Sequence, residues 1–109
     1  MSYDNNPYST PEKYGLISFG DIDFSSGYYE FDITAVLRRV SDGAFFYVSD
    51  SGCSCPCPFE NTKLSDLTPL DSLEEFQKYC ADRRWEGEED RTRPLVVNLL
   101  ERLHAAGVR

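Results

Sequence analysis

The sequence contains almost no histidine: His104 is the only one among 109 residues. An activated cysteine or serine nucleophile needs a neighbouring base, so His104 is the single imidazole available for that role. It follows the apolar Leu103 near the expected end of a helix, which favours a structural role. Phosphate-binding glycine loops, nucleophile elbows, and zinc-protease and kinase signatures are missing as well. No residue set indicates an active site, so the sequence leaves catalysis open but favours a protein that is not an enzyme.

Long apolar runs and signal-peptide features are also missing, so we expect no membrane partner and a reducing, cytoplasmic compartment. Basic residues are few: 11 stand against 19 acidic ones, which gives a net charge of −8. The arginines lie in scattered pairs flanked by acids: Arg38 and Arg39, Arg83 and Arg84, Arg91 and Arg93. This distribution predicts no direct binding to nucleic acid, whereas a basic protein partner remains compatible with it.

Apolar residues make up 40% of the chain, with seven phenylalanines and seven tyrosines, which predicts a folded protein. Residues 1–14 are polar, contain Pro7 and Pro11, and predict a flexible N-terminal arm. Residues 15–107 are then expected to form a single domain. The sequence leaves a homo-oligomer open.

Residues 16–50 have the pattern of strands. From Tyr29 to Leu37 the odd positions are apolar, and Asp42-Gly43 favours a two-residue hairpin that would place Val40 opposite Phe45. Strands are expected at about 16–24, 28–40 and 43–49, and helices at about 70–84 and 93–106. The sequence thus predicts an α+β fold, with a three-stranded antiparallel β-meander followed by two α-helices packed on the sheet. The preferred register of the first two strands places Ile22 opposite Phe31.

Four cysteines form one candidate site. Cys53, Cys55 and Cys57 alternate within SDSGCSCPCPFE (49–60), and Cys80 lies on the apolar stripe of the first expected helix. Four thiolates are a ligand set for zinc, but alternate cysteines do not form the usual two-ligand turn. Pro56 and Pro58 also bias the preceding cysteines towards extended backbone, which spreads the sulfurs apart. We therefore expect no cofactor, and a structural zinc or redox module is the alternative.

The segment 50–60 is expected to be a stiff loop that links the sheet to the helices. Ser51-Gly52 is the expected turn, and Phe59 is the candidate anchor into the core.

Four acidic residues of the first two strands form a second candidate site: Asp21, Asp23, Glu30 and Asp32. Four carboxylates on one face of a sheet are suited to a divalent cation or a basic partner. The alternative is a solvated or neutralised acidic surface. We favour the alternative, because strand residues lack the turning loop of calcium sites.

An aromatic strip on one face of the sheet is the candidate partner-binding surface: Val36, Arg38, Val40, Phe45 and Tyr47. If the helices cover the other face, with Phe31, Ile33 and Leu37, this strip is exposed, and its composition is typical of a binding hot spot. The alternative is that the second helix or the N-terminal arm covers it.

Two segments carry a family resemblance: Pro11-Glu12-Lys13-Tyr14-Gly15-Leu16, and the string that follows the hairpin, S-D-S-G-C-S-C-P-x-P-F-E. Over about residues 7–83 the chain resembles a family of small uncharacterised proteins of actinobacterial bacteriophages, mycobacteriophage-like in sequence. The resemblance implies a phage origin and the host bacterial cytoplasm, and no activity. The resulting hypothesis is a small acidic, phage-encoded protein that binds a host or phage protein, with the cysteine-based metal or redox module as the alternative.

Overall fold

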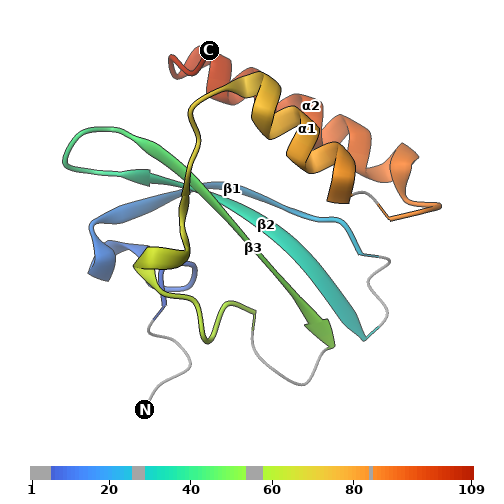
Figure 1. Ribbon diagram of the computed structural model, residues 1–109, viewed down its shortest axis with the longest axis horizontal. Coiled ribbons are helices and arrows are strands. Elements are labelled where there is room, and N and C mark those ends of the chain that lie inside the picture. The colour runs from blue at the N-terminus through green and yellow to red at the C-terminus, as the bar shows by residue number, and fades with distance from the viewer. Residues whose placement is uncertain (1–5, 26–28, 54–57, 84) are drawn as a thin grey trace.

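The computed structural model describes residues 6–25, 29–53, 58–83 and 85–109, without the side chain of Cys53. The expected α+β class is confirmed, with one antiparallel sheet and two α-helices. The sheet contains β1 (Leu16–Asp23), β2 (Glu30–Arg39), β3 (Phe45–Cys53) and β4 (Thr68–Pro69), in that order. Helices α1 (Leu73–Arg83) and α2 (Glu89–Ala105) lie side by side on one face of the sheet (Figure 1).

The prediction of a three-stranded meander is wrong, because the sheet has a fourth strand. β4 pairs with the start of β3 at Phe46–Pro69 and Tyr47–Thr68. The Leu70 amide also donates to the Phe45 carbonyl at 2.9 Å. A strand of two residues that contains a proline has no alternating pattern, so the sequence offered no periodic signal for it.

Three expected boundaries also change. β3 continues to Cys53, so Ser51-Gly52 lies within the strand and does not form the expected turn. α1 begins at Leu73 because the Ser72 hydroxyl accepts the Glu75 amide at 3.3 Å, as an N-cap does. α2 begins at Glu89, which places Pro94 inside the helix and not at its first turn.

A β-bulge at Phe19 sets the register of β1 against β2. Ser18 pairs with Leu37 and Gly20 pairs with Val36, so Phe19 is the extra residue. Arg102 of α2 donates to the Phe19 carbonyl at 2.6 Å and lies over its ring. Ile22 pairs with Thr34, and the expected pairing with Phe31 is wrong. The register before the bulge would place Ile22 opposite Ile33, so the bulge accounts for one residue of the three-residue shift. A bulge transfers the following residues to the other face of the strand, which sequence alternation alone does not reveal.

The close approach of α2 explains the glycine beside the bulge. A Cβ atom on Gly20 would lie 3.1 Å from the Leu99 and Arg102 side chains. Gly20 therefore lets the helix lie directly on β1.

The hairpin between β2 and β3 is longer than expected. Arg38, not Val40, pairs with Phe45, and residues 40–43 form the connection. Gly43 has a left-handed φ of 75°, and the Asp42 carboxylate accepts the Ala44 amide and pairs with Arg39. The hydrogen bond from Arg39 is the main cause that lowers the pKa of Asp42 to about 2. These contacts favour the longer turn over the two-residue one.

The sheet is covered on both faces. Under the helices, Ile22, Phe24, Val36 and Phe45 pack against a buried helical stripe that consists of Phe76, Cys80, Val96, Leu99 and Leu103. On the opposite face a second cluster contains Leu16, Ala35, Leu37, Val48 and Phe59.

The second cluster is closed by two irregular segments. Residues 6–14, assigned by the sequence to a flexible arm, lie against this face, with Asn6 and Pro7 buried and a 3-10 turn at Pro11–Tyr14. The Tyr8 ring stacks on Phe59 at 4.4 Å. Phe59 has no exposed surface, which confirms the expected anchor.

The anchor yields a stability prediction. Phe59→Ala should lower the free energy of unfolding by about 3–4 kcal/mol, the usual cost of a Phe-to-Ala cavity. Leu64→Ala, in the same connection but half exposed, should cost less than about 0.5 kcal/mol. Urea unfolding followed by far-UV circular dichroism measures both. Equal losses in the two variants would show that Phe59 does not anchor this face.

Candidate functional site

The aromatic strip expected to bind a partner is not an open surface. Val36 and Phe45 are buried beneath the helices, and Tyr47 packs on Phe76 and Tyr79 at ring distances of 5.2 and 4.6 Å. Arg38 lies over the Phe45 ring, and only Val40 is largely exposed. The expectation of an exposed strip is therefore wrong. Both faces of the sheet are apolar, so alternation did not determine which face the helices cover.

The four acidic residues do not form one cluster. Asp21 and Asp23 pair with Ala35 and Ile33, so they share a face with these residues, whereas Glu30 and Asp32 belong to the helix side of β2. Asp21 is exposed and accepts the Tyr8 hydroxyl at 2.8 Å. Burial and this bond raise the pKa of Tyr8 to about 12. Within the described ranges, no three histidine, cysteine or acidic side chains converge as a metal site would require.

Asp23 instead holds the end of β1. Its carboxylate accepts the Ser25 amide, the Ser25 hydroxyl and the Asp32 amide at 3.0, 2.7 and 3.1 Å. Burial alone would raise the pKa of Asp23. The hydrogen bonds from Ser25 and Asp32 have a larger opposite effect, so the pKa of Asp23 is lowered overall. Arg91 of α2 donates to the carbonyls of Asp23 and Ser25 at 2.9 and 2.6 Å, so this corner also binds the second helix.

Only part of the cysteine site can be located. Cys80 lies in the core on α1, with no exposed surface. Cys55, Cys57 and the side chain of Cys53 lie outside the described residues. The zinc or redox module stays a prediction.

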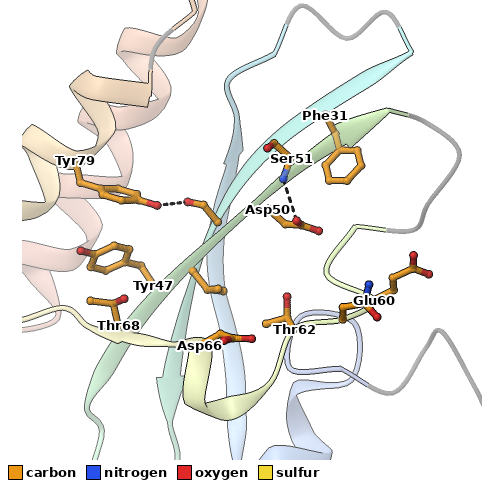
Figure 2. A pocket seen from close by; sticks show the side chains of 12 residues that line it. Phe31, Tyr47, Asp50, Ser51, Glu60, Thr62, Asp66, Thr68 and Tyr79 are labelled. Carbon is orange, nitrogen blue, oxygen red and sulfur yellow. Dashed lines mark hydrogen bonds between the residues drawn. The ribbon is translucent and has the colours of Figure 1, made fainter.

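A cavity that no sequence motif indicated lies along the outer edge of β3. Its volume is about 610 Å³. β3 contributes Tyr47 to Ser51, and the segment after it contributes Glu60 to Thr62 (Figure 2). Phe31, Asp66, Thr68 and Tyr79 complete the wall. The cavity therefore spans both sides of the strand edge.

Backbone groups of β3 face this cavity. In an antiparallel ladder, alternate residues direct their amide and carbonyl groups to the same side. The Phe45 carbonyl points towards β4, because it accepts the Leu70 amide, so Tyr47, Ser49 and Ser51 share that direction. Pairing with β4 ends at Tyr47. Among the strands that the structure describes, none pairs with Ser49 or Ser51 on this side.

The Asp50 carboxylate bonds the strand to the segment that begins at Phe59 and that lines the other side of the cavity with Glu60 to Thr62. It accepts the Ser51 amide at 3.0 Å and the Phe59 amide at 2.7 Å. Among the hydrogen bonds found in the described residues, none outside the ladder with β2 uses the Ser49 amide and carbonyl or the Ser51 carbonyl, so these edge groups are left for a ligand.

The wall of the cavity on the helix side, formed by Ser49 and Tyr79, is held by a polar network between the sheet and α1. The Ser49 hydroxyl lies 2.7 Å from that of Thr34. It also lies 2.5 Å from that of Tyr79, a contact drawn as the dashed line at Tyr79 in Figure 2. Arg83 lies beside the Tyr79 ring, and its guanidinium pairs with Asp32. Trp85 donates to the other Asp32 oxygen at 2.8 Å. Polar residues inside apolar strands, such as Asp32 and Thr34, were the available sequence signal for this network.

The described lining of the cavity offers polar groups of several kinds. The described residues that line the cavity offer hydroxyls, an amide, carboxylates and backbone groups, and include no histidine, lysine or cysteine. The Ser49 and Tyr79 hydroxyls bond to each other, and none of the hydrogen bonds found among the described residues joins either of them to a lining carboxylate.

A family model described as "Domain of unknown function (DUF7574)" matches residues 5–106. The chain belongs to this family. A search of curated proteins and a search of solved structures found no match. The DUF7574 match spans the sheet and both helices, so the cavity lies within the family's domain. No described helix of this DUF7574 chain is long and apolar enough to cross a membrane.

The network predicts a stability difference between two acids of β2. Asp32→Asn leaves Arg83 without its counter-charge and should cost about 2–3 kcal/mol. This is less than for a fully buried pair, because the Arg83 side chain is 25% exposed. Glu30→Gln, at an exposed site in the same strand, should cost less than about 0.5 kcal/mol. Urea unfolding by circular dichroism compares them, and a similar loss in both would contradict the structural role of Asp32.

The lowered pKa of Asp23 predicts a pH dependence. The unfolded chain binds the Asp23 proton more tightly, so the stabilisation is complete above the unfolded pKa of about 3.9 and is lost as the pH falls below it. Asp23→Asn should therefore be less stable at pH 7 and lose less stability between about pH 4 and pH 2. Thermal unfolding across this range tests it against the exposed control Asp82→Asn, and the idea fails if both variants follow the parent chain.

Proposed function

We propose that this chain is a phage-encoded, non-enzymatic protein that acts in the host bacterial cytoplasm by binding a host or phage protein. An extended segment of the partner adds to the sheet along β3, beyond the end of β4. The observation that carries the proposal is the edge of β3 at Ser49 and Ser51, which opens onto the cavity and which no described strand pairs with on this side. Phage origin and location rest on the sequence resemblance alone.

The edge has the features that strand addition requires. Main-chain hydrogen bonds supply affinity in this mode of recognition, and pockets for alternate side chains supply specificity. Ser49 and Ser51 provide the main-chain groups. The cavity on either side of them provides space for side chains directed to both faces.

The described part of the edge contains no proline, lysine or bulge that would block strand addition. Proteins block exposed edges with lysine, proline, bulges or a covering segment. From Val48 to Gly52 the strand contains neither lysine nor proline, and its bulge-free pairing with β2 continues to Cys53.

The position of the cavity favours a foreign segment over a second copy of this chain. Two copies paired through β3 would bring Asp50, Glu60 and Asp66 of each against those of the other. Like charges that face one another across a strand pair are unfavourable.

The test uses peptides selected from a random display library against the intact chain. We expect selected peptides to shift the amide NMR signals of Ser49 and Ser51. N-methylation of each peptide residue in turn should abolish binding at alternate residues only, because alternate amides face the edge. The matched control is N-methylation at the intervening residues.

Other results would overturn the proposal. These are peptides that shift signals on α2 but not on β3, N-methylation effects without alternation, or a β3-paired dimer of this chain with which no peptide competes. Size-exclusion chromatography and the same NMR spectra identify that dimer.

A further inference from the structure

We infer that the segment bound at the β3 edge is basic, with lysine or arginine at the residue that faces Asp50 and an uncharged residue on either side. This inference rests on the proposed function and specifies its partner. The argument starts from the charges of the lining.

The cavity carries three acidic side chains, Asp50, Glu60 and Asp66, and no basic residue lines it in the described part of the chain. In Figure 2, Asp50 and Asp66 lie along the space in front of β3, and Glu60 lies at its outer margin. Asp50 and Asp66 accept hydrogen bonds from neutral backbone amides, those of Ser51, Phe59 and Lys63. Hydrogen bonds from neutral amides leave the negative charges of both carboxylates in place.

Ion pairs within the fold do not neutralise these carboxylates. The ion pairs found among the described residues join Arg39 to Asp42, Lys78 to Glu74, Arg83 to Asp32 and Arg91 to Glu88. None includes a carboxylate of the cavity. A basic ligand therefore meets three carboxylates that form no ion pair with the described residues, and complementary charge favours its encounter and its register.

Because side chains of a strand alternate between its two faces, the preferred charge of the ligand also alternates from residue to residue. Residues directly opposite one another in a strand pair share a face. A ligand residue opposite Asp50 lies on the same face of the sheet as the Asp50 side chain, which is the face turned away from the helices. Glu60 also lines the cavity. Ligand residues opposite Ser49 and Ser51 lie on the other face, against the rings of Tyr47 and Tyr79 (Figure 2). The basic residue is therefore flanked by residues suited to aromatic contact.

Glu60 is the residue to change. Asp50 holds Phe59 in place, so its substitution would disturb the fold. Glu60 is half-buried, lines the cavity and makes no hydrogen bond or ion pair among the interactions found in the described residues. Glu60→Gln preserves its shape and removes its charge. Glu86→Gln, at an exposed acid outside the cavity lining, is the matched control.

The experiment continues from the selected peptides, whose N-methyl scan identifies the residues that pair with Ser49 and Ser51. We expect lysine or arginine to be enriched at the residue between them. Its replacement by glutamine should weaken binding about threefold to tenfold in fluorescence anisotropy at low salt, and less at high salt.

Glu60→Gln should weaken the lysine peptide by a smaller factor, because two of the three carboxylates remain, and it should leave the glutamine peptide unchanged. Glu86→Gln should affect neither. Peptides that bind the edge without this enrichment, or with affinities that Glu60→Gln does not change, overturn the basic-segment inference and leave the edge-binding proposal standing. If no selected peptide acts on Ser49 and Ser51, the edge-binding proposal itself fails.

Discussion

β2 is buried on both of its faces: Val36 and Leu37, adjacent and opposite in direction, are each 0% exposed, and Ala35 is 2% exposed. A sheet with two apolar faces needs two covers. The helices supply one. The other comes from residues 6–14 and from the connection after β3, which inserts Phe59 and packs Leu67 against the same cluster. The described part of that connection packs on the face of the sheet opposite the helices. It then returns to the sheet, where only Thr68–Pro69 pair with β3. The open edge is thus a consequence of covering the second face.

The two layers are held at one relative position by polar contacts that also form the cavity wall. Asp32 on β2 fixes Arg83 and Trp85, and the Tyr79 hydroxyl on α1 bonds to Ser49 on β3. A ring held at both its hydroxyl and its face loses little freedom when a ligand contacts it. Such preorganisation reduces the entropic cost of binding. The network that stabilises the helix layer therefore also shapes one side of the site.

Local sequence signals were sufficient for the fold class, both helices and the Phe59 anchor, because periodicity and a large apolar side chain in a polar loop are properties of neighbouring residues. Long-range contacts decided the rest. The Phe19 bulge depends on Arg102, which is 83 residues away, and it changes the face of every later residue in β1. Asp32 resembled a surface acid until Arg83 and Trp85, 51 and 53 residues further on, were placed beside it. The cavity was missed for the same reason, since β3, residues 60–62 and α1 supply its walls.

Part of the net charge of −8 is concentrated at the β3 edge, because several arginines make contacts elsewhere in the fold. Arg83 and Arg91 contact acidic partners or carbonyls within the fold, and Arg102 binds the carbonyl of the bulge. Cations committed to internal contacts are not available at the β3 edge, where Asp50, Glu60 and Asp66 remain unneutralised by the described ion pairs. Two such edges repel one another. In the proposed binding mode, this charge does what lysine or proline does on other exposed strands. It disfavours pairing with a second copy of this chain and, unlike proline, leaves the Ser49 amide and carbonyl and the Ser51 carbonyl for a segment of opposite charge.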